Sequence, residues 1–183
     1  IASVSYGLNP LFALPLYASG IRVDSVLFYR YVFALLFLAV MMKMSGQSFA
    51  LKRNEILPVA VMGLLFSFSS LFLFQSFNYM DAGIASTILF MYPVLVAVIM
   101  AVFFKERLSV VKIASIATAF VGISMLYKGE GGATLSMTGV CLVLMSSLTY
   151  ALYIVGVNRS SLKEMPGLKL TFYAILFGSL VYI

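Results

Sequence analysis

The chain has 183 residues, of which 63% are hydrophobic and 10% are charged, and its mean hydropathy is +1.09. Soluble domains contain roughly 45–50% apolar and about 25% charged residues. These values therefore exclude a soluble globular protein, a disordered chain and a soluble nucleic-acid binder, although the net charge is +6. Because a transmembrane helix uses about 20 residues, the chain has room for about seven membrane spans and little else.

Several kinds of site are excluded by missing residue types. The chain contains no histidine and a single cysteine, Cys141. It therefore lacks the residues for a Ser-His-Asp or Cys-His catalytic site, an intrachain disulfide or a thiolate metal cluster. Glycines are scattered and form no phosphate-binding loop of the nucleotide-binding type. We expect no cofactor and no metal ion.

Seven apolar runs of helical length follow one another along the chain. Their approximate limits are 1–19, 25–44, 56–77, 82–104, 110–127, 135–157 and 168–183. The runs are too long and too uniformly apolar for strands of a membrane barrel, so all seven are predicted to be helices. The first run has no basic start and contains prolines, which argues against a cleaved signal peptide. Because the sequence begins with Ile and both ends lie within apolar runs, we expect it to be part of a longer chain.

Individual residues predict where these helices begin, bend and pack. Asp81 precedes the fourth run and stands at an N-cap position. Pro10 and Pro93 are expected to kink the first and fourth helices. Gly139 and Gly156 would let the sixth helix approach its neighbours closely.

Basic residues predict the orientation of the chain. One set of alternate connections carries nine of the twelve Lys and Arg residues: Lys43, Lys52, Arg53, Lys105, Arg107, Lys112, Arg159, Lys163 and Lys169. The opposite connections carry only Arg22 and Lys128. By the positive-inside rule the first set is cytoplasmic. Topology thus accounts for the positive charge, and no nucleic-acid partner is needed to explain it.

The connections are too short to form a domain, so any function must lie between the helices. Three classes remain: a transporter or channel, an intramembrane enzyme, and a structural subunit of a membrane complex. Each acidic residue lies at or beyond the end of a span; the six are Asp24, Glu55, Asp81, Glu106, Glu130 and Glu164. An intramembrane aspartyl protease or a metal-dependent transferase needs carboxylates at membrane depth. We therefore predict that the protein is not an enzyme and that these spans hold no proton-coupling site.

Polar side chains inside the apolar runs predict a cavity, because they are costly in hydrocarbon and usually face a bundle interior. We expect this cavity near the midplane, lined by the first, third, fourth and sixth helices. The residues predicted to contact a substrate are Tyr6, Asn9, Gln75, Tyr79, Tyr92 and Tyr150. For single Ser and Thr residues, hydrogen bonds within their own helix are the simpler explanation.

Arg30 lies inside the second run, and two roles stay open for it. As a structural residue it would extend to the outer interface or pair with Asp24 or Asp81. As a functional residue it would anchor a substrate carboxylate or phosphate. The flanking Tyr29 and Tyr31 are expected to serve packing or the membrane interface.

A weak internal repeat divides the chain. Ser5-Tyr6-Gly7 is similar to Thr149-Tyr150-Ala151, and Phe28-Tyr29-Arg30 is similar to Phe172-Tyr173-Ala174, about 144 residues later. The offset fits a five-helix unit that begins again at the sixth helix. Because five is odd, the second copy would enter the membrane from the opposite side, which gives the inverted repeats of many transporters.

One stretch carries a family resemblance. The segment 76–89, Ser-Phe-Asn-Tyr-Met-Asp-Ala-Gly-Ile-Ala-Ser-Thr-Ile-Leu, resembles the junction between the third and fourth helices of the EamA family in the drug/metabolite transporter superfamily. The family pattern continues with a proline in the fourth helix, an acidic-basic pair after it and a glycine ending the fifth helix. Pro93, Glu106-Arg107 and Gly122 stand in that order. The resemblance covers essentially the whole chain.

The resemblance implies a polytopic bundle of ten helices in two inverted five-helix repeats, of which this chain shows seven. Residues 1–127 would form the first repeat and 128–183 the start of the second. Such carriers export amino acids or other small metabolites and lie in the bacterial inner membrane with both termini in the cytoplasm. Glu106 and Arg107 would form a structural or gating feature at the cytoplasmic end.

The sequence therefore predicts an all-helical carrier that works by alternating access. Its expected partners are a small-molecule substrate and the lipid bilayer, as a monomer or homodimer and without nucleic acid. The alternatives are a membrane channel and a structural or assembly subunit of a membrane complex.

Overall fold

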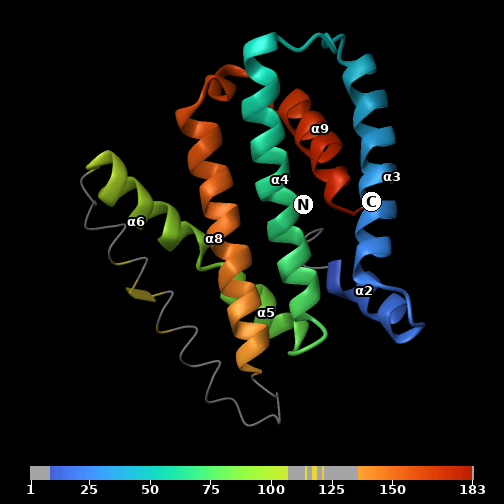
Figure 1. The fold of residues 1–183 in the computed structure, drawn as a ribbon, viewed down its shortest axis with the longest axis vertical. Coiled ribbons are helices and arrows are strands. Elements are labelled where there is room, and N and C mark those ends of the chain that lie inside the picture. The colour runs from blue at the N-terminus through green and yellow to red at the C-terminus, as the bar shows by residue number, and fades with distance from the viewer. Residues whose placement is uncertain (1–8, 107–113, 115–116, 119–120, 122–135, 183) are drawn as a thin grey trace.

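Figure 1 shows the fold as a computed structural model, which describes residues 9–106, 114, 117–118, 121 and 136–182. The elements in chain order are α2 (Asn9–Ala18), α3 (Val23–Met44), α4 (Arg53–Ser76), α5 (Ala82–Leu89), α6 (Tyr92–Phe104), α8 (Met137–Arg159), the 3-10 helix η1 (Ser161–Glu164), α9 (Gly167–Gly178) and the 3-10 helix η2 (Ser179–Tyr182). For this part of the chain, the predicted all-helical fold is confirmed.

Four stretches of the described residues are long and apolar enough to cross a membrane: Val23–Met44, Arg53–Ser76, Ala82–Phe104 and Met137–Arg159. The 22 residues of α3 extend about 33 Å at 1.5 Å per residue, against a hydrocarbon core of about 30 Å. A shorter apolar stretch covers Gly167–Tyr182. The expected span 110–127 lies largely outside the described residues, and the expected span 1–19 is described only from Asn9.

The distribution of side chains is that of a membrane protein. Phe37, Leu57 and Phe103 expose 71%, 73% and 77% of their surface, whereas Ser67 and Ser146 are fully buried. In water, exposing large apolar side chains is unfavourable. Lipid tails are as apolar as these side chains, so the outer faces of the helices are suited to a bilayer. The chain is thus a multi-pass membrane protein.

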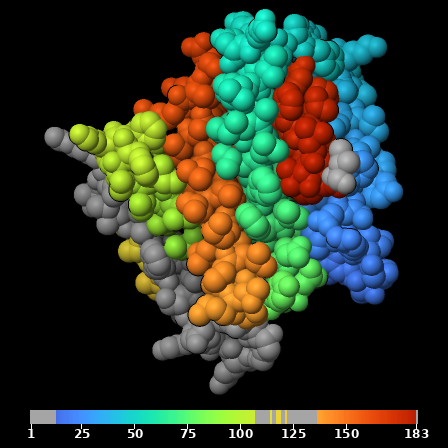
Figure 2. All heavy atoms as spheres, in the orientation of Figure 1, coloured from blue at the N-terminus to red at the C-terminus, as the bar shows by residue number. Residues whose placement is uncertain are grey.

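Helix α4 lies at the centre of the bundle. It packs against α8 on one side and α9 on the other, and α9 also packs against α3. Figures 1 and 2 show α9 set between α4 and α3, with α6 beyond α8 at the opposite edge. Two sequence neighbours, α3 and α4, are thus separated over much of their length by a helix from the far end of the chain.

Two glycines allow α4 and α9 to approach closely. A Cβ atom added at Gly63 of α4 would stand 2.5 Å from the carbonyl oxygen of Ala174 in α9. A Cβ atom at Gly178 of α9 would overlap the Ser67 hydroxyl and lie 2.8 Å from the Gly63 carbonyl oxygen. Small residues permit such backbone contact between membrane helices, where dispersion and hydrogen bonds drive association.

Helix α8 uses glycine in the same way, as the sequence predicted. A Cβ atom at Gly139 would lie 2.9 Å from the Met80 sulfur, and one at Gly156 would overlap the Met62 side chain. Each glycine therefore leaves space for a methionine side chain: Gly156 for Met62 of α4, and Gly139 for Met80, which follows α4. The expected close packing between the fourth and fifth helices falls largely outside the described residues.

The expected single helix 82–104 is two helices in the structure. Helix α5 ends at Leu89 and α6 begins at Tyr92, with Pro93 in the first turn of α6. Proline has no N–H group and so cannot donate to the carbonyl four residues earlier, which is that of Leu89. The Ser147 hydroxyl of α8 donates to this carbonyl instead, at 3.2 Å. The carbonyl group that the break leaves without a helical partner is therefore hydrogen-bonded by a neighbouring helix.

The predicted cap of α5 is confirmed. The Asp81 carboxylate accepts hydrogen bonds from the backbone N–H groups of Gly83 and Ile84, at 2.8 and 3.2 Å. These bonds satisfy two of the N–H groups that the first turn of a helix leaves unpaired.

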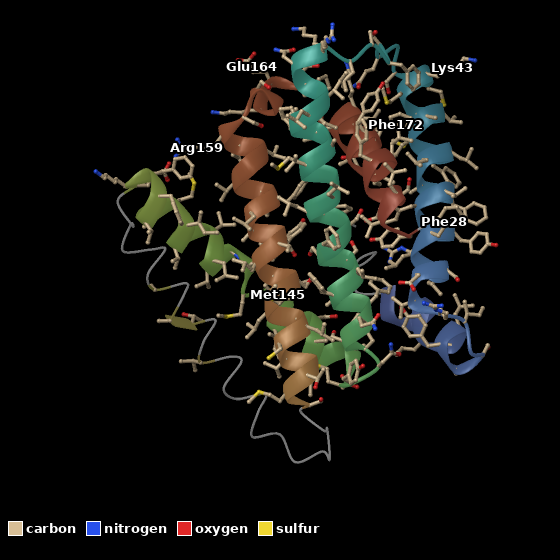
Figure 3. All side chains as sticks on the ribbon, viewed as in Figure 1. Phe28, Lys43, Met145, Arg159, Glu164 and Phe172 are labelled. Atoms are coloured by element: carbon tan, nitrogen blue, oxygen red, sulfur yellow. The ribbon has the colours of Figure 1, made fainter. Side chains whose placement is uncertain are left out.

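The two ends of the bundle differ in charge. Lys43, Arg159 and Glu164 lie at the upper end in Figure 3. Lys52, Lys163 and Lys169 line one pocket at this same end. The connection between α2 and α3, which holds Arg22 and Asp24, lies at the opposite end (Figure 1).

Candidate functional site

A small pocket between α3, α4, α8 and α9 contains polar groups in the interior of the bundle. We call it the central pocket. Its volume is about 140 Å³, and its lining residues are Leu27, Arg30, Tyr31, Ala34, Phe66, Ser69, Ser70, Leu73, Phe74, Tyr150 and Ile175. Five of these carry a guanidinium or hydroxyl group. The rest of the lining is apolar, so the polar groups define where a ligand could bind.

Hydroxyl groups connect α3, α4 and η2 beside this pocket. The Ser67 hydroxyl donates to the Tyr31 oxygen at 3.2 Å, and the Tyr31 hydroxyl lies 3.4 Å from Ser70 Oγ. Tyr182 of η2 donates to the Ser67 carbonyl oxygen at 2.7 Å. Tyr31 is only 5% exposed, and Ser67 is fully buried. These bonds fix the ring of Tyr31 at the wall of the central pocket.

Aromatic rings continue from the central pocket towards α6. Tyr92 of α6 meets Tyr150 of α8 edge to face, with ring centroids 4.8 Å apart. Further ring contacts of 5.4 to 6.4 Å join Tyr150, Tyr153, Phe66 and Tyr31. Such pairs stabilise packing beyond the area they bury. We call this set of five rings the aromatic row; it runs through α6, α8, α4 and α3.

Two serines join α4 to α8 beside the pocket. The Ser69 hydroxyl donates to the Ser146 carbonyl at 2.9 Å, and the Ser146 hydroxyl donates to the Ser69 carbonyl at 2.7 Å. Both side chains are buried. The exchange satisfies both hydroxyls, so two polar residues are accommodated at the contact of two apolar helices.

Arg30 lies where the central pocket meets a second, larger pocket. This outer pocket has a volume of about 450 Å³ and is lined by Ala13, Leu16, Ile21, Val26, Tyr29, Arg30, Phe33 and Phe74. The Arg30 guanidinium stands over the Phe74 ring, 4.9 Å from its centroid. The pairings considered from the sequence are not the ones found, because Asp24 pairs with Arg22 at 3.1 Å and Asp81 caps α5.

The predicted substrate residues do not all come together. Tyr150 and Arg30 line the central pocket, and Tyr92 joins them through the ring of Tyr150. Gln75 lines a separate pocket of about 290 Å³ beside Asp24, and Tyr79 is 44% exposed in the connection between α4 and α5. Both lie near the end of the bundle that holds the α2–α3 connection.

The remaining predicted residues belong to the start of the chain. Tyr6 lies outside the described residues. Asn9 begins α2 and Pro10 is its second residue. The segment before Asn9, relative to which a kink at Pro10 would be defined, lies outside the described residues. Pro15 lies inside α2.

The basic end of the bundle holds an ion pair that includes Glu106. Glu106 pairs with Arg159, which joins the end of α6 to the end of α8. The Arg159 guanidinium also stands 4.4 Å from the ring centroid of Phe104. Arg107, the expected neighbour in this feature, lies outside the described residues.

Several residues of the central pocket were not singled out from the sequence. The sequence favours packing for Tyr31 and bonds within the helix for single serines. The Ser70 hydroxyl does bond to the Phe66 carbonyl within α4, at 3.2 Å, whereas the Ser69 hydroxyl bonds to Ser146 of α8. Ser67 and Ser70 are three residues apart and thus share a helix face. That spacing was the available signal, but only the packing of α3, α8 and α9 around α4 shows that this face borders a cavity.

The described residues contain no group of three or more His, Cys, Asp or Glu side chains that could hold a metal ion. Cys141 is exposed. The chemistry available at the central pocket is therefore recognition by a cation, hydroxyl groups and aromatic rings.

Comparison with known proteins finds one transporter family and relatives named as transporters. The model of the EamA-like transporter family matches residues 1–128. An uncharacterized transporter of Bacillus subtilis (strain 168), YxxF, is 29% identical over 131 residues, which cover 69% of this chain and 42% of the relative. An uncharacterized transporter of Archaeoglobus fulgidus is 28% identical over 102 residues, covering 56% of this chain and 36% of the relative.

A second Bacillus subtilis protein, the uncharacterized transporter YvbV, is 29% identical over 104 residues, covering 56% of this chain and 34% of that protein. The chain thus spans well under half the length of the curated relatives it matches. No solved structure matches the chain significantly.

Proposed function

Because this chain belongs to the EamA-like transporter family, we propose that it forms part of a carrier that exports amino acids or other small metabolites by alternating access. Its membership of this family and its similarity to relatives named as transporters support a membrane transporter. The substrate class, the direction and the mechanism are our proposal. We also propose that it has no enzymatic activity.

The observation that carries this proposal is the central pocket. Arg30, Tyr31, Ser69, Ser70 and Tyr150 bring polar groups from α3, α4 and α8 to one cavity inside an otherwise apolar bundle. Polar groups at membrane depth are costly and mark substrate pathways more often than lipid-facing surfaces. A small metabolite passing through the membrane needs such groups to replace part of its hydration.

A ten-helix arrangement in two inverted repeats is part of the proposal, with residues 1–127 as the first repeat and 128–183 as the start of the second. The helix directions support it. Helix α3 runs upward in Figure 1, whereas α9, which would correspond to it in the second repeat, runs downward. Corresponding helices of opposite direction are what inverted repeats require.

We further propose that the protein lies in a bacterial inner membrane, as a monomer or homodimer, with the basic end of the bundle in the cytoplasm. The gathering of Lys43, Arg159 and three further lysines at one end supports this orientation. The described acidic residues lie at or beyond helix ends. We therefore place no proton-coupling carboxylate in these spans.

The test is a metabolite-export screen with the full-length protein. A strain that lacks the gene should retain the exported compound in its cells, and expression of the full-length protein should restore its release. Counterflow in proteoliposomes then separates a carrier from a channel, because only a carrier exchanges labelled for unlabelled substrate with saturation. Unchanged metabolite levels together with the dissociation of a membrane complex in the deletion strain would favour an assembly subunit.

A further inference from the structure

Arg30 borders two cavities of different chemistry. The central pocket is bordered by the hydroxyl groups of Tyr31, Ser69, Ser70 and Tyr150. The first three also bond to protein groups, and their oxygens can accept a further hydrogen bond from a ligand. Among the described residues, the outer pocket is lined by apolar and aromatic side chains, with Arg30 as its only charged residue. Arg30 and Phe74 line both pockets, so a ligand bound at the guanidinium would reach a polar cavity on one side and an apolar one on the other.

The charge around both pockets is one-sided. No Asp or Glu lines either of them. The two acidic residues considered from the sequence as partners of Arg30 are already engaged: Asp24 by Arg22 and Asp81 by the first turn of α5. Within the described residues, a ligand in these cavities therefore meets a fixed positive charge and no fixed negative charge.

With respect to the part of the chain that the structure describes, the hydrogen-bonding groups of Arg30 are open to a ligand. Its contact with Phe74 is made to an aromatic ring, which accepts none of the five N–H donors in the way an oxygen does. No hydrogen bond or ion pair of the Arg30 side chain is found among the described residues. A guanidinium with free donors binds a carboxylate through two parallel hydrogen bonds.

We propose that the cargo is an organic monocarboxylate with an apolar portion, bound by Arg30 through its carboxylate. This inference rests on the proposed transport function and specifies its substrate class. The apolar portion occupies the outer pocket. The central pocket has room for roughly four or five waters at about 30 Å³ each, which suits a carboxylate and a neighbouring hydroxyl or keto group.

The same geometry disfavours amines and, less strongly, free amino acids. An ammonium group in these cavities would lie near Arg30 without a carboxylate partner, and like charges repel strongly in a medium of low dielectric constant. The carboxylate of a zwitterionic amino acid could bind Arg30, but the ammonium group of the amino acid would stay unpaired. A deaminated or N-acylated acid with the same side chain avoids this cost.

Three probes with the same phenyl group test the inference: 3-phenylpropionate, phenylalanine and 2-phenylethylamine. Binding is measured on the purified full-length protein with radiolabelled probes, and transport by counterflow in proteoliposomes. We expect 3-phenylpropionate to bind at least tenfold more tightly than phenylalanine, and 2-phenylethylamine not to bind. Arg30→Gln should weaken 3-phenylpropionate binding at least tenfold, and Arg30→Lys should restore part of it.

Two controls make the result specific. Arg53→Gln removes an exposed arginine at the other end of the bundle and should leave binding unchanged. The neutral 3-phenylpropanamide should bind wild type and Arg30→Gln with similar, weak affinity. If 3-phenylpropionate binding survives Arg30→Gln in folded protein, the role of Arg30 is wrong.

The outcomes separate this inference from the proposed function. Counterflow of phenylalanine or 2-phenylethylamine with no preference for the acid would overturn the substrate class and leave the carrier function intact. Tight Arg30-dependent binding of 3-phenylpropionate without counterflow would support the site and contradict the carrier. Absence of both binding and transport for all probes would overturn the inference.

Discussion

Single serine and tyrosine residues form hydrogen bonds between helices in the interior of this bundle. Tyr31, Ser67, Ser70 and Tyr182 form one connected set, with separations of 2.7 to 3.4 Å. In hydrocarbon an unsatisfied hydroxyl is costly, so each of these groups finds a partner. Hydroxyls shared in this way hold the wall of the central pocket without a buried carboxylate.

Gly178 is a described residue at which the packing leaves no room for a side chain. Gly178→Ala places a methyl group against the Ser67 hydroxyl and the Gly63 carbonyl, so α9 must move away from α4. We expect the free energy of unfolding to fall by about 1–3 kcal/mol, the usual cost of overpacking. The measurement is SDS-induced unfolding of the full-length protein in mixed micelles.

Gly167→Ala is the matched control for this prediction. A Cβ atom at Gly167 meets nothing within 4 Å, so the free energy of unfolding should change by less than about 0.5 kcal/mol. Equal effects of the two substitutions would contradict the close approach of α9 to α4.

At the scale of helices, α4 and α8 form the most extensive pair, and they are joined by hydrogen bonds as well as by packing. Apolar packing alone gives little preference between a neighbouring helix and lipid. The reciprocal hydrogen bonds of Ser69 and Ser146 specify how α4 and α8 are aligned, because they form only at one register of the two helices. Ser147 adds a third contact at the end of α5.

A double-mutant cycle tests the serine pair. Ser69→Ala and Ser146→Ala should each destabilise the protein, and the double mutant should be less destabilised than the sum of the two. The expected coupling is about 0.6 kcal/mol, the average found for hydrogen bonds between membrane helices, and at most about 1.7 kcal/mol. Unfolding of the full-length protein in mixed micelles gives the four free energies.

Thr171 supplies the control for the cycle. Its hydroxyl is exposed and bonds to Gly167 within α9. Combining Thr171→Ala with Ser69→Ala should give additive effects, since the two residues share no partner. A coupling near zero for Ser69 and Ser146 would show that their hydroxyls act independently.

At the scale of the whole molecule, the bundle has a basic end and an end where the α2–α3 connection lies (Figure 1). The Glu106–Arg159 pair joins α6 and α8 at the basic end. Because both side chains of this pair are substantially exposed, it contributes little to stability by itself.

Site-specific labelling tests the proposed orientation. In a Cys141→Ser background, Asn54→Cys places a thiol at the basic end and Asn78→Cys places one in the connection between α4 and α5; both positions are exposed. In spheroplasts, a membrane-impermeant maleimide should label the thiol at position 78 directly. It should label the thiol at position 54 only after permeabilisation.

The Cys141→Ser protein alone should stay unlabelled under both conditions. Direct labelling at position 54 with protection at position 78 would show that the basic end faces outward, contrary to the positive-inside rule.

Much of the secondary structure could be predicted because it depends on local sequence. Helix α3 begins two residues before its predicted start, and α4 and α8 lie within a few residues of their predicted limits. The interruption at residues 90–91 was less predictable. Pro93 indicated a bend, but a complete break also needs the Ser147 hydroxyl from α8 to satisfy the Leu89 carbonyl.

The candidate site was only partly predictable for the same reason. Arg30, Tyr92 and Tyr150 could be singled out because a polar or aromatic residue inside an apolar run is conspicuous. Gln75 and Tyr79 were equally conspicuous, yet they lie away from the central pocket. Position along a helix does not say which neighbour the side chain faces.

The long, uniformly apolar runs of the sequence already specified a helical protein that spans a membrane, because hydrocarbon offers no partner to backbone polar groups and a helix pairs nearly all of them within one segment. Tertiary structure decided the order of the helices: α9 lies between α3 and α4, which brings Tyr182 to Tyr31, and α6 meets α8 through the pair of Glu106 and Arg159. Hydropathy cannot specify this order, since a lipid-facing and a protein-facing surface are equally apolar. Glycine contacts and hydroxyl pairs distinguish them, and these act only when the helices meet.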